Sequence, residues 1–207
     1  MSSIKCLILP GWQNSGEGHW QTLWEAEHGY ERVIQHDWMR PLRGDWITRL
    51  EDHLLLNSEH TTYILCREET ENALKISPQS SSNTPRPSIV LVAHSLGCHL
   101  IAAWAALSKN TRRVKGALLV APPDCSREDF PPEMKSWRNP VLQKLPFPSI
   151  CVISSNDPFC ALQPGREMAR AWGSECIELG DKGHINASSG LGDWPQGQAL
   201  LAIASAR

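Results

Sequence analysis

Ser95, Asp157 and His184 have the types and the chain order of a site for acyl transfer. A serine hydroxyl becomes a nucleophile when a neighbouring histidine takes its proton, and that histidine needs a carboxylate to hold its tautomer. Each of the three residues follows a predicted strand. Because the carboxyl ends of parallel strands meet at one edge of a sheet, we expect these three side chains to converge there.

The residues around Ser95 predict a sharp turn from a strand into a helix. Residues 89–97 read Ile-Val-Leu-Val-Ala-His-Ser-Leu-Gly, and the apolar run 98–107 follows. Small residues on either side, Ala93 and Gly97, allow the strained backbone that lifts a serine hydroxyl above the sheet. The usual pattern has Gly where this chain has Ala. A serine at such a junction can instead be a helix N-cap, so other residues must decide.

Two other aspartates compete with Asp157 for the role of the acid. Asp157 lies just past the apolar strand 149–154, as the acid of this chain order should. Asp124 comes one strand too early. Asp181 lies three residues before His184, where we expect it to shape the loop. Asp157 is therefore the predicted acid.

The remaining histidines predict no metal site. His94 lies inside the turn and His99 on the following helix, so both are expected to pack or to support the site. The other five lie in the first third of the chain, without the spacing of metal ligands: His19, His28, His36, His53 and His60. We expect neither a metal nor a cofactor.

Two backbone N–H groups are candidates for an oxyanion hole. Leu96 begins the helix after Ser95, and Trp12 lies in the Gly-rich loop 10–20 that follows the predicted strand 5–9. The glycine spacing in this loop matches neither a dinucleotide fingerprint nor a P-loop, which argues against nucleotide binding. Five side chains are expected to contact substrate: Gln13, Asn14, Trp20, Trp38 and Phe159.

Eight short motifs resemble the retinoblastoma-binding protein nine family of small serine hydrolases, and most closely its bacterial members. They are Leu9-Pro10-Gly11-Trp12, Gly18-His19-Trp20, Asp45-Trp46, and the segments 92–97, 120–124, 145–149, 155–158 and 183–186. The resemblance covers nearly the whole chain outside one insertion. It implies a compact α/β-hydrolase with Ser95, Asp157 and His184 as its triad, and it implies no particular substrate.

The alternation of strands and helices predicts an α/β fold. We expect a three-layer α/β/α sandwich around a mostly parallel, doubly wound sheet, as in an α/β-hydrolase without a large cap domain. With 207 residues, 41% of them hydrophobic, one domain spanning 1–207 can bury its core. A polar insertion at about 58–88 departs from the family pattern. It contains a candidate strand (61–66) and a candidate helix (68–76), and its role is either a solvated excursion or a lid or docking segment.

The composition of the chain argues against nucleic acid and membranes as partners. A formal net charge of −2 gives no basic field for nucleic acid, and no stretch approaches the 18 apolar residues of a membrane helix. We expect a cytoplasmic monomer or small homo-oligomer with no membrane or nucleic-acid partner, and any protein partner is not identifiable from the sequence. The odd number of cysteines, with no CxxC, fits a reducing compartment. Cys160 is open to oxidation if it is exposed.

The expected reaction is hydrolysis of an ester, thioester or activated amide of a small acyl substrate through an acyl-enzyme. The Pro-rich segment 122–148 is expected to lie over the site as a stiff flap, with Phe130, Met134 and Trp137 facing the pocket. Two alternatives remain open. One is a catalytically silent or weak hydrolase-fold protein that binds a partner, and the other is a non-hydrolytic acyltransferase that uses the same triad.

Overall fold

A computed structural model describes residues 4–56 and 88–206, whose strands form one six-stranded sheet. The strands pair in parallel in the order β2-β1-β3-β4-β5-β6. Their bounds are β1 (Ile4–Leu9), β2 (Glu31–Arg32), β3 (Ser88–His94), β4 (Val114–Val120), β5 (Ser149–Ile153) and β6 (Glu175–Glu178). The chain runs from β1 to β2 in one direction and then returns past β1 to β3, so the strand order reverses between β1 and β3. Ligands bind at such reversal points in open α/β sheets.

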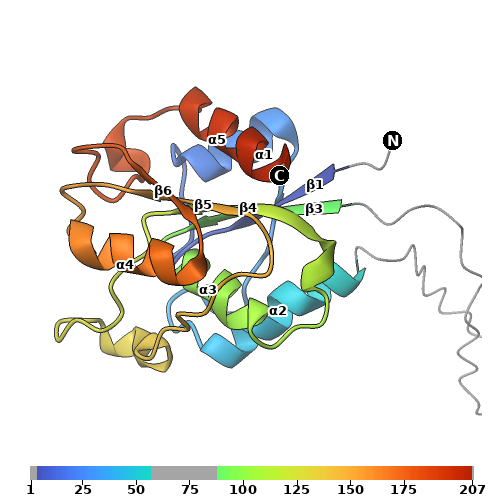
Figure 1. The fold of residues 1–207 in the computed structure, drawn as a ribbon, viewed down its shortest axis with the longest axis horizontal. Coiled ribbons are helices and arrows are strands. Elements are labelled where there is room, and N and C mark those ends of the chain that lie inside the picture. Colours follow the sequence, from blue (N-terminus) through green and yellow to red (C-terminus); the bar gives the residue numbers. More distant parts are fainter. Residues whose placement is uncertain (1–3, 57–87, 207) are drawn as a thin grey trace, which may run out of the picture.

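Helices cover both faces of the sheet, which confirms the predicted three-layer α/β class (Figure 1). α1 (Trp20–His28) and α5 (Pro195–Ala206) lie on one face. α2 (Arg43–Leu56), α3 (Leu96–Ala105) and α4 (Leu162–Trp172) lie on the other. Buried indoles fill both interfaces, with Trp20, Trp24 and Trp194 on the α1 face and Trp46, Trp104 and Trp172 on the α2 face.

Some elements differ from the sequence-based expectation. The two-residue strand β2 and the helix α5 were not predicted. The sequence pattern predicts helical character over 166–172, and α4 begins earlier, at Leu162. Nearly all of the predicted insertion at 58–88, including the candidate strand 61–66 and the candidate helix 68–76, lies outside the described residues; Ser88 begins β3.

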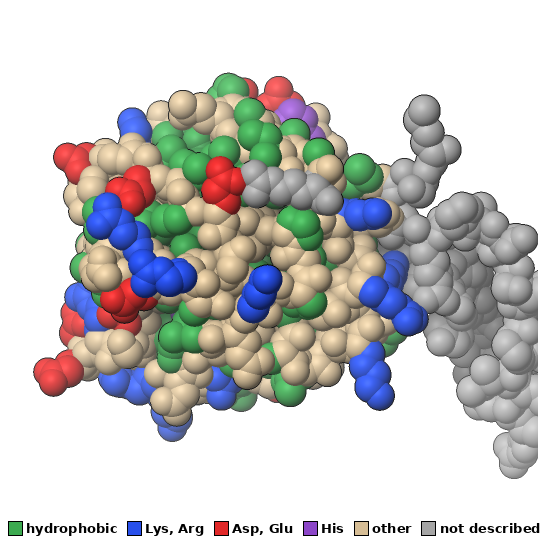
Figure 2. Space-filling model, in the orientation of Figure 1, with side chains coloured by type: hydrophobic (Ala, Val, Ile, Leu, Met, Phe, Trp, Pro, Cys, Tyr) green, Lys and Arg blue, Asp and Glu red, His purple; other side chains and the backbone are tan. Residues whose placement is uncertain are grey.

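On the face shown in Figure 2, acidic and basic side chains lie next to one another over the left half.

The turn after β3 packs directly against β1. Ala93 pairs with Leu9 and Leu119 on the neighbouring strands and is fully buried, so its methyl group fits in the core that covers this face of the sheet. A Cβ atom at Gly97 would lie 2.2 Å from the Leu9 carbonyl oxygen. The chain therefore tolerates alanine at position 93, whereas it has no room for a side chain at position 97.

We expect Gly97→Ala to destabilise the protein by about 1–3 kcal/mol or more, because a backbone carbonyl cannot move aside without shifting β1. Gly44→Ala is the matched control, since position 44 lies in α2 with no atom within 4 Å of its Cβ site. Alanine there should stabilise the helix by about 0.5–1 kcal/mol. Urea denaturation of both variants measures the difference, and equal midpoints for Gly97→Ala and wild type would contradict this packing argument.

Candidate active site

Ser95 lies at the turn between β3 and α3 in a strained backbone conformation. Its φ of 55° and ψ of −125° fall in a region that residues other than glycine rarely adopt. Although it occupies the N-cap position of α3, its side chain makes no capping hydrogen bond. The strain thus does not serve to cap the helix, and the cap interpretation that the sequence left open is wrong. Strain of this kind is concentrated at functional sites.

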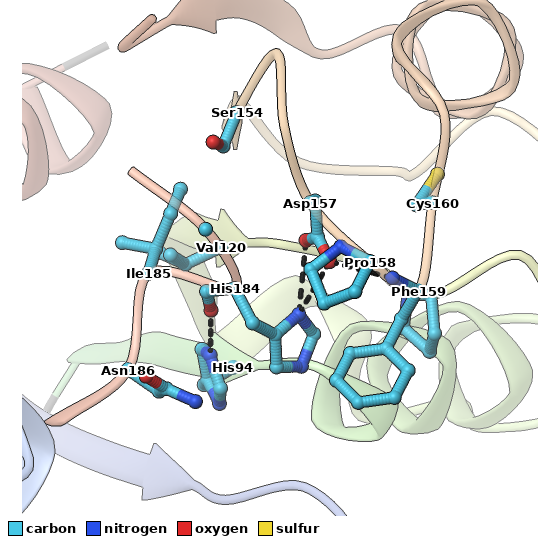
Figure 3. A network of polar contacts seen from close by, with 12 residues as sticks. His94, Val120, Ser154, Asp157, Pro158, Phe159, Cys160, His184, Ile185 and Asn186 are labelled. Atoms are coloured by element: carbon cyan, nitrogen blue, oxygen red, sulfur yellow. Dashed lines mark hydrogen bonds and ion pairs between the residues drawn. The ribbon is translucent and has the colours of Figure 1, made fainter. Parts of the chain in front are cut away.

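Asp157 and His184 form a hydrogen-bonded pair between two loops (Figure 3). His184 Nδ1 lies 3.0 Å from Asp157 Oδ1 and 2.9 Å from Oδ2, and only 9% and 3% of the two side chains are exposed. The Phe159 backbone N–H donates to Asp157 Oδ1 over 2.9 Å. A carboxylate accepts only, so Nδ1 carries the proton and Nε2 keeps its lone pair.

The two competing aspartates have other partners. Asp124 accepts hydrogen bonds from the Ser126 backbone N–H (3.0 Å) and hydroxyl (2.5 Å). Asp181 accepts one from the Ser155 hydroxyl over 2.6 Å. Neither is hydrogen-bonded to His184, whose imidazole is held by the carboxylate that the sequence favoured.

Ser95 and His184 line one cavity of about 520 Å³. Three of the five expected substrate contacts, Gln13, Asn14 and Phe159, also line it. The Phe159 ring lies 4.6 Å from the His184 ring, centroid to centroid. The other lining residues are Trp12, His19, His94, Pro123, Asp124, Arg127, Asp129, Phe130, Pro131, Met134, Pro158, Asn186, Ala187 and Ser188.

Three expected pocket residues lie elsewhere. Trp20 is 1% exposed and packs between α1 and the sheet, Trp38 packs on Trp46, and Trp137 is buried with its indole N–H on the Pro41 carbonyl. These rings point into the two cores because an indole buries a large apolar surface there. The placement of Trp20, Trp38 and Trp137 at the pocket is therefore corrected. Phe130 and Met134, from the same Pro-rich segment as Trp137, do reach the cavity.

The loop after β1 touches the turn that carries Ser95. A Cβ atom at Gly11 would lie 2.6 Å from Ser95 Cβ. Gln13 and Asn14 both have positive φ (66° and 65°), which turns this loop back over the sheet edge. No described group accepts a hydrogen bond from the backbone N–H of Trp12 or of Leu96.

Arg32 holds this loop from the neighbouring strand, and sequence reasoning missed it. Its guanidinium donates to both carboxylate oxygens of Glu25, over 2.6 and 2.7 Å. The same group donates to Asn14 Oδ1, the Ser15 carbonyl and the Thr22 hydroxyl, over 2.7, 2.8 and 2.8 Å. Neither the two-residue strand β2 nor the spacing of these partners carries a recognisable sequence signal.

Two more imidazoles lie behind His184. His94 Nε2 lies 2.8 Å from the His184 carbonyl oxygen, and the His19 ring packs on His94 with centroids 4.7 Å apart. Burial lowers the pKa of His94 well below its usual value and that of His19 to about 4. His94 thus supports the site, as expected, whereas His19 joins it without having been predicted. His99 bonds to the Pro123 carbonyl instead, and burial lowers its pKa to about 4.

The described residues give little support for redox chemistry at Cys160, for a metal site or for a membrane helix. Cys160 is 5% exposed, and burial followed by the charges of Asp157 and Asp124 raises the pKa of its thiol to about 12, so oxidation is not favoured. Among residues 4–56 and 88–206, no three His, Cys, Asp or Glu side chains are grouped as metal ligands. No helix in this part of the chain is long and apolar enough to cross a bilayer.

Comparison with solved structures finds the same fold. A YdeN-like hydrolase from Pectobacterium atrosepticum matches with a TM-score of 0.71 and 23% identity over 99% of this chain and 91% of that chain. The ydeN gene product of Bacillus subtilis matches with a TM-score of 0.67 and 15% identity over the whole of both chains. Est1E from Butyrivibrio proteoclasticus matches with a TM-score of 0.63 and 11% identity over 98% of this chain and 87% of its own.

Sequence comparison adds the family. No curated protein matches this chain. The family model for Serine hydrolase matches residues 6–67 and 76–203, which is most of the chain, and its name agrees with a site built around Ser95. The narrower resemblance to the retinoblastoma-binding protein nine family stays a prediction. The chain belongs to the Serine hydrolase family.

Proposed function

We propose that this hydrolase cleaves an ester, thioester or activated amide of a small acyl substrate, with Ser95 as nucleophile, His184 as base and Asp157 as its orienting acid. One observation carries the proposal. Ser95, which lies in a strained turn and does not cap the helix with its hydroxyl, shares a cavity with His184, whose Nδ1 is held by the buried carboxylate of Asp157. Three separate loops bring these groups to one sheet edge. That arrangement matches the division of roles in a Ser-His-Asp triad.

The proposed reaction has two halves. Ser95 Oγ attacks the acyl carbonyl while His184 Nε2 takes the hydroxyl proton, and the same imidazolium then protonates the leaving group. In the second half, water gives its proton to His184 and attacks the acyl-enzyme, which releases the acid. The backbone N–H groups of Leu96 and Trp12 bind the oxyanion in both halves. Their lack of a described acceptor supports this role.

The Ser95 hydroxyl makes no hydrogen bond with the described residues. Hydrogen bonds between a nucleophile and its base are often long in the absence of substrate and tighten in the complex. The shared cavity and the orientation of His184 by Asp157 are therefore the stronger geometric support.

The residues that line the cavity favour a substrate whose acyl group is uncharged. Phe130 and Met134 supply apolar surface, and the Arg127 guanidinium is paired with Asp129 through two hydrogen bonds, of 2.8 and 2.6 Å. Asp124 is another lining carboxylate; the Arg127 charge acts on it from nearby, but Asp124 forms no ion pair with a described cation. A negative charge on the substrate would face this carboxylate in a partly enclosed site, where repulsion is stronger than in bulk water.

A fluorophosphonate probe and 4-nitrophenyl acetate test the triad. Ser95→Ala should abolish labelling, and His184→Ala and Asp157→Asn should lower hydrolysis by roughly 10³-fold or more, because the base or its tautomer is lost. Asp181→Asn is the control and should keep the rate within about threefold. A folded wild-type protein that neither labels nor hydrolyses the ester would refute the proposed function. A normal rate in Asp157→Asn would refute the acid assignment.

A matched pair of esters tests the charge preference. We expect wild type to hydrolyse 4-nitrophenyl hexanoate faster than the 4-nitrophenyl monoester of adipic acid, which has the same chain length and a terminal carboxylate. Asp124→Asn should lower the ratio of kcat/KM for the hexanoate to kcat/KM for the adipate monoester by about fivefold at low salt, since a repulsive charge is removed. An unchanged ratio would show that Asp124 does not select the substrate.

A further inference from the structure

The loop that carries His184 has left-handed backbone on both sides of this residue, and the conformation is strained at Ile185. Gly183 and Ile185 flank His184 with φ values of 55° and 48°. A β-branched residue in this region is unusual and costs about 1–3 kcal/mol, so surrounding contacts must hold it there. Ile185 is fully buried against the core that contains Trp20 and Trp194.

Two side chains from distant elements bind consecutive carbonyls of this loop. His94, the last residue of β3, has its Nε2 2.8 Å from the His184 carbonyl oxygen, as Figure 3 shows. Trp20, the first residue of α1, donates its indole N–H to the Ile185 carbonyl over 2.8 Å. The two rings also meet edge to face, with centroids 6.1 Å apart. We call these two hydrogen bonds the base-loop clamp.

The chemistry of the clamp determines which atoms donate. A carbonyl oxygen can only accept, so His94 Nε2 must carry a hydrogen, and an indole nitrogen is always a donor. Burial keeps His94 in its neutral form, because it lowers the pKa of this residue well below its usual value. Replacing either donor with an apolar group would leave a loop carbonyl without its partner.

The opposite side of the loop is bound to the segment after β5. Asn156 Oδ1 accepts the Gly183 backbone N–H over 2.6 Å, and Asp157 holds the His184 ring. Asp157 thus holds the imidazole of His184, while His94 holds the backbone carbonyl of the same residue. His94 is also the chain neighbour of Ser95, so a single residue links the nucleophile turn to the base loop.

We propose that His94 and Trp20 are positioning residues that hold the His184 imidazole in line with Ser95. This inference rests on the proposed function, because it concerns the same nucleophile and base. The clamp acts on the rates of acylation and deacylation rather than on substrate affinity. Small displacements of a catalytic group lower rates steeply while leaving binding contacts in place.

The first test exchanges the His94 donor. His94→Met removes the donor, and His94→Gln restores an N–H group on a side chain of similar length. We expect His94→Met to lower kcat for 4-nitrophenyl acetate by about 10- to 100-fold, with KM within about twofold, and His94→Gln to recover most of the loss. The fluorophosphonate labelling rate should follow kcat. Urea denaturation of both variants establishes that each is folded.

The second test uses two indoles of α1. Trp20→Phe removes the N–H that binds the Ile185 carbonyl, while Trp24→Phe removes one that binds the Asp193 carbonyl, outside the base loop. Both tryptophans are buried, at 1% and 0% exposure, so the two changes disturb packing similarly. We expect a loss of about tenfold in kcat for Trp20→Phe, compared with less than about twofold for Trp24→Phe.

The outcomes separate the clamp from the proposed function. If wild type labels at Ser95 while His94→Met and Trp20→Phe label at the wild-type rate, the clamp is refuted and the triad stands. Equal losses in Trp20→Phe and Trp24→Phe, or no recovery in His94→Gln, would also refute it, since packing alone would then explain the effect. A folded wild type that does not label refutes the proposed function and the clamp together.

Discussion

The close approach of the Ser95 turn to the end of β1 is the constraint on which the site depends. At Gly97 the helix α3 lies so close to the Leu9 carbonyl that no side chain fits between them. At Gly11 the loop after β1 lies similarly close to Ser95. Because the order of strands reverses between β1 and β3, the Ser95 turn and this loop are adjacent there. The two proposed oxyanion donors, the backbone N–H groups of Trp12 and Leu96, therefore belong to the two segments that meet at this contact. No further helix or loop is needed to supply them.

Polar side chains from distant elements hold the loops of the site in place. Arg32 donates two hydrogen bonds to the loop after β1 and three to α1, which follows that loop. His94 and Trp20 bind the loop that carries His184. Several of these loop residues have positive φ, so their conformations cost free energy that the hydrogen bonds offset. A rigid sheet edge with loops bound in this way can keep catalytic groups oriented before substrate arrives.

Much of the fold could be predicted because its signals are local. Apolar runs ending in small or polar residues marked β1, β3, β4 and β5, and their alternation with helices indicated the parallel sheet. β2 was missed because two residues carry no periodicity. Trp20 and Trp38 were placed at the pocket incorrectly, because an aromatic residue near a site has the same sequence signal whether its ring faces the cavity or the core.

By itself, the sequence determined the order of most elements, without β2 and α5, and the placement of Ser95, Asp157 and His184 after the strands β3, β5 and β6. These are properties of local pattern and of parallel-sheet geometry. Only the tertiary structure decided which carboxylate binds His184, which rings line the cavity and which side chains hold the loops. Those choices depend on side-chain directions and on contacts between different elements, from Asp157 with His184, 27 positions apart, to Trp20 with Ile185, 165 positions apart. No local pattern encodes such contacts, because they arise only when the packed layers bring the loops together.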